Sequence, residues 1–290
     1  MRVWQRGDRR AVHKPLLVLF ALGRLARGEA AFPEFSAVEG ELGRLLFEFG
    51  PSGSERTRHN PFWHLKTDGL WELHGPASLL DRPAGATPTI TELRAHHVAG
   101  DFPAGLRTQM QRDPGLVEEI ASRIVQAHFP ESIRQDVLDA VGLGGEQLGR
   151  AVSMTTRARR DPAFRERVLV AYEYRCCVCG HDLRLGSQVI GLEAAHIKWF
   201  NAGGPDIECN GLALCSLHHK IFDLGAFTVL PDGHQIAFSQ HMVGGSETQA
   251  RLLAHHGASL VQPQCRDYAP NPDFLAWHRR EVFKEPQREV

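Results

Sequence analysis

The sequence lacks an excess of charge of either sign, a long apolar run, and any cysteine before residue 176. Lys and Arg total 33 against 34 Asp and Glu, so the formal net charge is -1 and the whole chain exerts no long-range attraction on phosphate. The longest apolar run near the start, residues 15–22, is far too short to span a bilayer, and no cleavable signal pattern precedes it. We therefore expect a soluble, cytoplasmic protein with no membrane partner, in which any basic surface is local.

A local basic surface could form within the first 30 residues, where only Asp8 and Glu29 oppose seven basic side chains. The basic residues are Arg2, Arg6, Arg9, Arg10, Lys14, Arg24 and Arg27. This composition suits contact with phosphate, and it suits an ordinary solvated helix face equally well.

The length and composition favour two domains. With 290 residues and 42% hydrophobic content the chain can bury two ordinary cores, and its Gly and Pro punctuation supports that division. We predict a first domain over residues 1–145, a linker over 146–158 within and after a Gly-rich segment, and a second domain over 159–290. The expected fold class is α+β, with a mainly helical first domain that carries a small β-hairpin or sheet.

Periodicity predicts the elements of the first domain. Apolar residues recur at helical spacing over 11–28 and 35–49, and Ser36 is a candidate cap for the second helix. Asp68-Gly69 lies between alternating aromatic and polar residues of segment 62–73, which predicts a β-hairpin. Further helices are expected near Thr91, over 116–128 and over 133–141.

The second domain is expected to mix helices and short strands. Asp161-Pro162 predicts a helix start, because a Pro at the first helical position costs no hydrogen bond. An apolar strand is expected to end at His196, and apolar spacing in NGLALCSLHHKIFD predicts a helix over 210–223. The remaining expected elements are a hairpin with an Asp-Gly turn over 227–238 and a last helix from Asn271-Pro272 to 283.

Six cysteines are bunched with histidines in the second domain, which in a cytosolic chain favours metal binding over disulfides. A C-x-x-C pair and a C-x-x-H pair each place two ligands on a tight turn, as a closed tetrahedral zinc site requires. The four predicted zinc ligands are Cys176, Cys179, Cys215 and His218. Cys177 and Cys209 are spare, and the alternative for the cysteines among the four ligands is the role of small buried hydrophobes.

The order C-x-x-C, A-A-H-I, N-G-L-x-L-C-x-x-H-H and F-D over residues 176–223 resembles the ββα-metal motif of HNH nucleases. That resemblance implies that His196 is the general base, that Asn210 orients the loop carrying it, and that His219 ligates a catalytic metal ion. Taken singly, the histidine could be a core residue at a strand end and the asparagine a helix cap.

Phosphodiester hydrolysis needs the two groups that this motif offers. Imidazole titrates near neutrality and can accept a proton from water, and a divalent ion such as Mn²⁺ or Mg²⁺ stabilises the developing charge. Many HNH nucleases carry an acidic residue directly before the base, where this chain has Ala195. Glu193 and Asp223 are the candidate carboxylate ligands, and the second lies four residues from His219 on one helical face.

Three segments of the first domain, VHKPLLVLFALGRL, RHNPFWHL and DGLWEL, resemble the sulfur-binding domain of McrA-like type IV restriction endonucleases, which cut phosphorothioate-modified DNA. By this resemblance Asn60, Pro61 and His64 lie at a shallow apolar cup for sulfur, and His13 and Lys14 lie beside the modified phosphate. An apolar wall favours sulfur because sulfur is larger than oxygen and a weaker acceptor. The family has an aromatic residue where this chain has Asn60.

The loop before the cup supplies candidate contacts to phosphates and bases. These are Arg56, Arg58 and His59, and the alternative for them is a solvated loop. The sequence as a whole predicts a metal-dependent endonuclease acting on double-stranded, phosphorothioate-modified DNA, with a homodimer for double-strand cutting. The alternatives are an HNH endonuclease specific for methylated or unmodified DNA, and a catalytically idle DNA-binding module braced by zinc.

Overall fold

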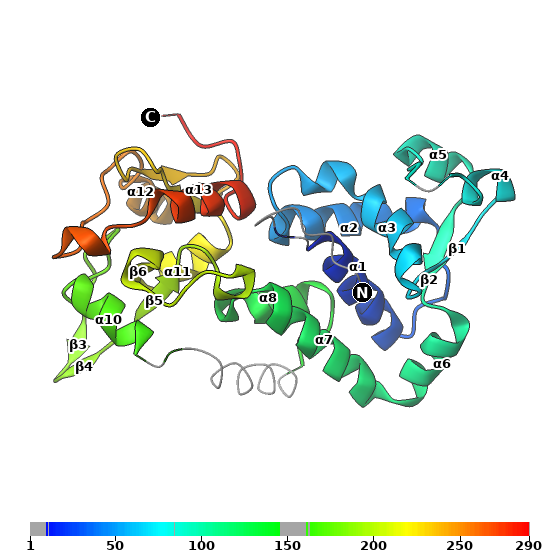
Figure 1. Ribbon diagram of the computed structural model, residues 1–290, viewed down its shortest axis with the longest axis horizontal. Helices are drawn as coiled ribbons and strands as arrows, with labels where there is room; N and C mark the ends of the chain where they lie inside the picture. Colours follow the sequence, from blue (N-terminus) through cyan, green and yellow to red (C-terminus); the bar gives the residue numbers. More distant parts are fainter. Residues whose placement is uncertain (1–9, 11, 84, 146–160, 162, 290) are drawn as a thin grey trace. The chain divides into compact units, whose positions relative to one another are not determined.

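The computed structural model describes residues 10, 12–83, 85–145, 161 and 163–289, which divide into two compact units (Figure 1). Unit 1 consists of Met1–His128 and Arg134–Met154, and unit 2 of Phe129–Ile133 and Thr155–Val290. The linker predicted over 146–158 lies outside the described residues, as do three of the basic residues near the start: Arg2, Arg6 and Arg9. No helix within the described residues is long and apolar enough to cross a membrane.

Unit 1 is built around α1 (His13–Ala26), whose residues from Pro15 to Gly23 are all buried. Because the residues of α1 are apolar on every side, the helix must be covered all round, and it packs against α2 (Phe35–Phe49), α3 (His59–His64) and α7 (Pro114–His128). The helices predicted over 11–28, 35–49 and 116–128 are confirmed. The expected cap is wrong, since Glu34 precedes the first turn of α2 and the Ser36 hydroxyl donates to the Glu34 carboxylate instead.

The shorter helices of unit 1 fill the spaces between these elements. The helix expected near Thr91 is confirmed, and it begins with a reciprocal capping box in which Thr89 and Glu92 satisfy each other's backbone N–H groups. The shorter helices are η1 (Ser54–Thr57), η2 (Leu65–Asp68), α4 (Ala77–Leu80), α5 (Ile90–Ala95) and α6 (Ala104–Arg112). Helix α8 (Glu131–Ala140) follows α7, as predicted, and its first residues belong to unit 2.

The hairpin predicted over 62–73 is wrong. The chain there forms α3 and η2, and Gly69 ends η2 in the left-handed region at φ 71° rather than turning between two strands. Unit 1 does contain a small sheet, in which β1 (Glu72–His74) pairs antiparallel with the distant β2 (Ala99–Asp101). Gly100 is required because a Cβ there would lie 2.6 Å from the Trp71 indole nitrogen.

Unit 2 contains the ββα arrangement that the motif predicts. Strand β5 (Leu192–His196) pairs antiparallel with β6 (Gly211–Cys215), so that His196 lies opposite Gly211, and α11 (Ser216–Asp223) packs on both strands. The helix predicted over 210–223 is therefore half wrong. The continuous apolar run from Gly211 to Cys215 forms a buried strand, and the helix begins only at the next residue.

The other elements of unit 2 enclose this ββα core (Figure 1). Helix α10 (Phe164–Ala171) packs on β5 and β6. The close approach of α10 to β6 requires a glycine at position 211, since a Cβ there would meet Val168 at 2.3 Å. The helix predicted from Asp161-Pro162 begins later, at Phe164, with the Asp161 carboxylate accepting from the Ala163 N–H.

Two predictions at the end of the chain are confirmed. The hairpin of β7 (Phe227–Val229) and β8 (Ile236–Phe238) forms within 227–238, and Asn271 caps α13 (Pro272–Glu281). The remaining elements are β3 (Arg184–Leu185), β4 (Gln188–Val189), η3 (Phe200–Ala202), η4 (Glu208–Asn210), α12 (Ser246–Leu253) and η5 (Arg266–Tyr268). The α+β fold class predicted from the sequence is confirmed.

Candidate active site and metal centre

The four predicted zinc ligands converge on one point. The ligand atoms of Cys176, Cys179, Cys215 and His218 all lie within 4.8 Å of one another. The C-x-x-C turn lies just after α10, Cys215 ends β6, and His218 lies in the first turn of α11, so the cluster joins helix to strand. The two spare cysteines lie elsewhere: Cys177 is fully buried and Cys209 half-buried.

The spacing within this cluster suits tetrahedral coordination. Zinc–sulfur and zinc–nitrogen bonds of about 2.3 and 2.0 Å imply edges of roughly 3.5 to 3.8 Å. The His218 Nδ1 lies 3.7 Å from Cys176 Sγ and 3.2 Å from Cys215 Sγ, and the Cys179 and Cys215 sulfurs are 4.0 Å apart. Hydrogen bonds from Cys179 and Cys215 lower the pKa of the Cys176 thiol, and a thiolate is the form that binds zinc. The residues therefore fit this metal.

His196 lies at the end of β5 with its ring held on one face and at one edge. It stacks on Phe164 with the ring centroids 4.1 Å apart and the planes 18° apart. Its Nε2 lies 2.6 Å from an oxygen of Asp206, a residue that the sequence analysis did not identify. Asp206 lies in a Gly-rich loop with no periodicity, so no local signal distinguishes it from a solvated carboxylate.

Asn210 is completely buried directly before β6. Its amide oxygen accepts from the Lys198 N–H at 2.8 Å, and its amide nitrogen donates to the carbonyls of Lys198 and Pro205 at 3.0 and 2.9 Å. These three bonds tie both ends of the loop that follows His196. They are the contacts that a loop-orienting residue would make, and they differ from the helix-capping alternative.

His219 lies between the two candidate carboxylates. Its Nδ1 is 2.5 Å from Glu193 on β5, and its Nε2 is 3.1 Å from Asp223, one turn further along α11. Burial opposes the charged imidazole, but Asp223 and Glu193 outweigh that effect and raise the pKa of His219 to about 9. The two carboxylates therefore contact different ring nitrogens.

Asp223 is the more enclosed of the two carboxylates, with its residue 3% exposed. One of its oxygens accepts from the Trp199 indole N–H at 2.9 Å, and the other accepts from the Ser132 hydroxyl as well as facing His219. Although burial opposes ionisation, His219 and Ser132 hold the pKa of Asp223 below its usual value. An ionised, enclosed carboxylate beside an imidazole is a donor pair that suits a divalent cation.

Three of these side chains, His196, His219 and Asp223, line one small pocket of unit 2. They share it with Trp199 and Phe200, and the segment Pro130–Ser132 closes one side. That segment is held by the Lys220 ammonium, which donates to the Ser132 carbonyl at 2.5 Å, and by Asn201, which donates to the Phe129 carbonyl at 2.7 Å. The proposed base and the proposed metal ligands thus share a common surface.

The candidate sulfur-site residues lie on neighbouring helices of unit 1, since His13 and Lys14 open α1 and Asn60 and His64 lie on α3. Lys14 forms an ion pair of 2.7 Å with Asp68, and His64 bonds the Thr87 hydroxyl at 2.8 Å. Pro61 is buried, which differs from the shallow cup that the resemblance implies.

The two candidate histidines on α3 are held in their neutral form. Burial, with further contributions from Arg58 and from His64, lowers the pKa of His59. Burial, together with Lys14 and Lys66, lowers the pKa of His64. At neutral pH these imidazoles therefore offer hydrogen bonds rather than positive charge to DNA.

The arginines of unit 1 differ in how firmly the fold holds them. Arg58 donates to Glu39 at 3.1 and 3.3 Å, whereas the Arg56 side chain is 84% exposed and faces its neighbour Glu55 at 3.7 Å. Three basic residues of the predicted patch are also engaged within unit 1. Arg10 donates to the Phe49 carbonyl, and Arg24 and Arg27 pair with Glu29.

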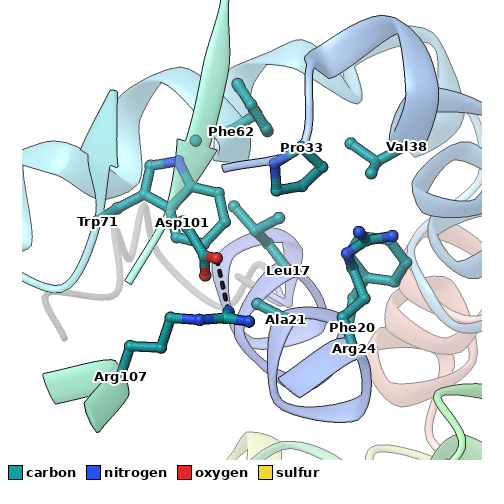
Figure 2. Close-up of a pocket in the computed structure, with 11 residues that line it drawn as sticks. Leu17, Phe20, Ala21, Arg24, Pro33, Val38, Phe62, Trp71, Asp101 and Arg107 are labelled. Carbon is teal, nitrogen blue, oxygen red and sulfur yellow. Dashed lines mark hydrogen bonds and ion pairs between the residues drawn. The ribbon is translucent and has the colours of Figure 1, made fainter. Parts of the chain in front are cut away.

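A cavity between α1 and the small sheet belongs to the core rather than to the sulfur site. Figure 2 shows it lined by apolar side chains, with the Arg107 guanidinium donating to Asp101 at 2.6 Å along one edge. At about 10 Å³ it holds at most one water molecule, and none of the candidate sulfur-site residues lines it.

Two strands, a helix, a Cys/His cluster and a histidine–asparagine–histidine constellation define unit 2 as an HNH endonuclease domain, and the HNH endonuclease family model matches residues 176–230. The chain belongs to the ScoMcrA-like DNA sulfur-binding domain family, whose model matches residues 1–146, half of the chain. The predicted combination of a DNA sulfur-binding domain and an HNH endonuclease domain is therefore confirmed.

Solved structures resemble the chain at low sequence identity. The sulfur-binding domain of ScoMcrA complexed with phosphorothioated DNA is 21% identical, with a TM-score of 0.45, covering 51% of this chain and 93% of that one. The type IV phosphorothioation-dependent restriction endonuclease ScoMcrA is also 21% identical, with a TM-score of 0.44, and the chain spans 27% of its length. The match covers 48% of this chain. A comparison with curated proteins finds no match.

Proposed function

We propose that the chain hydrolyses phosphorothioate-modified duplex DNA at the pocket of unit 2, with His196 as the general base. The observation that carries this proposal is the shared pocket of His196, His219 and Asp223, a base and two metal ligands drawn from β5 and α11. A reacting phosphate in that pocket would lie within reach of both groups, as in-line attack by water requires.

The roles of the remaining side chains follow from their contacts. His219 and Asp223 would hold a divalent cation between them, and Glu193 would accept a hydrogen bond from the opposite ring nitrogen of His219, which fixes the ring and strengthens it as a ligand. When bound, that cation supplies electrostatic stabilisation of the charge that develops on the phosphate. Asn210 keeps the loop after His196 closed.

The Cys/His cluster is proposed as a structural zinc site. All four ligand positions are supplied by side chains, so no position remains for water or substrate, in contrast to catalytic zinc sites with three protein ligands. Its place between α10, β6 and α11 supports a role in holding the helix that carries His219 and Asp223.

Recognition of sulfur is proposed for the surface of Asn60 and His64 on α3 beside Lys14 on α1. This proposal rests on the family match of residues 1–146 and on the position of Lys14 near His64, where burial and then the Lys14 charge lower the pKa of that histidine. The Lys14 ammonium, beside the neutral imidazole of His64, would neutralise the charge of the modified phosphate without occupying the position of the sulfur. Each apolar contact to sulfur contributes about 1 to 3 kcal/mol of selectivity.

The direct experiment incubates the protein with Mn²⁺ on matched phosphorothioate, methylated and unmodified duplexes and sizes the products. We expect cleavage of the phosphorothioate duplex alone, and a loss of at least about 100-fold in cleavage rate in His196→Ala with DNA binding retained. Equal cleavage of all three duplexes would reject sulfur recognition. Undiminished cleavage by His196→Ala would reject the base. The homodimer stays a prediction, to be measured by analytical ultracentrifugation on the modified duplex.

A further inference from the structure

Asp206 places a carboxylate directly against the imidazole of the proposed general base. Its Oδ1 lies 2.6 Å from His196 Nε2, and the two side chains are 15% and 8% exposed. Phe164 stacks on the imidazole, and Phe200 lies at a ring-centroid distance of 6.2 Å. The ring is thus fixed in both plane and rotation, and a carboxylate is placed at one particular nitrogen.

The second oxygen of Asp206 is also committed. Oδ2 accepts from the backbone N–H of Asp161 at 3.0 Å, and the Asp206 carbonyl accepts from Arg167 at 2.7 Å. Arg167 in turn pairs with the Asp161 carboxylate at 2.8 Å. The carboxylate is therefore anchored just before α10 and cannot rotate away from His196 without losing the Asp161 bond.

These contacts determine where the imidazole proton resides. A carboxylate can only accept a hydrogen bond, so the His196 nitrogen that faces Asp206 must carry a hydrogen. In neutral imidazole only one nitrogen is protonated, so a hydrogen on Nε2 leaves the basic lone pair on Nδ1. The arrangement is the same in principle as the carboxylate that fixes the histidine tautomer in serine proteases.

We propose that Asp206 is a positioning residue that holds His196 in the tautomer with a basic Nδ1, a proposal that rests on the assignment of His196 as the base. In the reaction, Nδ1 takes a proton from water as the water oxygen bonds to phosphorus. The bond from phosphorus to the leaving oxygen breaks, and that oxygen takes a proton from solvent. The imidazolium formed is stabilised by the Asp206 carboxylate.

Substitutions at this position separate a tautomer role from a merely structural one. In Asp206→Asn the amide oxygen would face the fixed Asp161 N–H, so the amide NH₂ would point at His196 Nε2. That nitrogen would then have to accept, which moves the proton to Nδ1 and removes the base. Asp206→Ala leaves the tautomer unconstrained. We therefore expect the isosteric Asn variant to be the less active of the two.

The test measures single-turnover cleavage of a phosphorothioate duplex by the full chain with zinc and Mn²⁺, alongside duplex affinity, Mn²⁺ affinity and thermal melting. We expect the rate of the chemical step to fall by about 10³-fold or more in Asp206→Asn and by about 10²-fold in Asp206→Ala. The affinities for the duplex and for Mn²⁺ should be unchanged in both variants. Asp232→Asn, in the exposed turn between β7 and β8, is the matched control and should cleave normally.

A second readout does not depend on activity. Nitrogen NMR of ¹⁵N-histidine-labelled protein with Mg²⁺, with His196→Ala used for assignment, reports which ring nitrogen carries hydrogen. We expect a protonated Nε2 in the parent and a protonated Nδ1 in Asp206→Asn. An Asn variant that cleaves as fast as the Ala variant, or an unchanged tautomer, would overturn the proposal. Cleavage that persists in His196→Ala would instead reject the proposed base.

Discussion

The candidate nuclease pocket and the candidate sulfur surface were both predicted from motifs, but the motif residues come together in the first and are dispersed among other contacts in the second. In unit 2 the motif residues contact one another or share a pocket, as His196, His219 and Asp223 do. In unit 1, Lys14 and Arg58 are engaged with carboxylates of their own fold, and Pro61 is buried. A motif carried on two paired strands and the next helix specifies its own geometry, whereas residues on separate helices depend on packing for theirs.

The largest effect expected on the nuclease side is loss of the proposed zinc site. Cys215→Ser removes a proposed ligand at the junction of β6 and α11, and we expect zinc content to fall to near zero and unfolding free energy to fall by more than about 4 kcal/mol. Cys265→Ser, at a half-buried cysteine outside the cluster, is the matched control. Metal analysis and thermal melting measure both, and a Cys215→Ser variant that keeps its zinc would contradict the ligand set.

Substitutions of the two carboxylates around His219 should differ sharply in their effect on Mn²⁺ binding. Asp223→Asn removes a proposed direct ligand and should weaken Mn²⁺ binding at this site beyond detection. Glu193→Gln keeps a hydrogen-bond acceptor at Nδ1 and should weaken it by about 10- to 100-fold. Isothermal titration of zinc-loaded protein measures both. The reverse order would exchange the roles of the two residues.

Unit 1 should lose stability in mild acid through a group remote from the motif. Burial, with Arg10 nearby, lowers the pKa of His128 to about 4, against about 6.5 in an unfolded chain. The unfolded chain therefore binds more protons as the pH falls from 6.5 to 4, and stability is lost over that window. The full shift corresponds to roughly 3 kcal/mol.

Denaturant unfolding at several pH values checks this expectation in the parent and in His128→Gln. The Gln variant should lose most of the dependence between pH 6.5 and 4. His59 and His64, whose pKa values are lowered as well, would leave a smaller dependence of the same sign. An unaltered pH dependence in the variant would assign the effect to other groups.

The sequence was most informative where spacing is short and chemistry specific. The C-x-x-C and C-x-x-H pairs, β5 and the ββα order were all predictable, because each follows from neighbouring residues. Segment 62–73 was not, because its turn signal at Gly69 serves a helix end and its strand pairs with residues some thirty positions away. Ser132 lines the pocket and Asp206 contacts His196 only through tertiary contacts, which local patterns do not record.

The smallest expected effect tests whether the loop before α3 meets DNA. Arg56 is exposed and loosely held, so Arg56→Ala should weaken binding of phosphorothioate and ordinary duplexes by the same few-fold factor, with unchanged melting and a salt dependence lower by about one phosphate contact. Arg58→Ala instead removes a partner of Glu39 and should lower stability by about 1 kcal/mol. Fluorescence anisotropy over a range of salt, with melting curves, separates the two variants. If Arg56→Ala weakened only the phosphorothioate complex, this arginine would belong to the sulfur site itself. The exposure of Arg56 would then not mark a general contact with the DNA backbone.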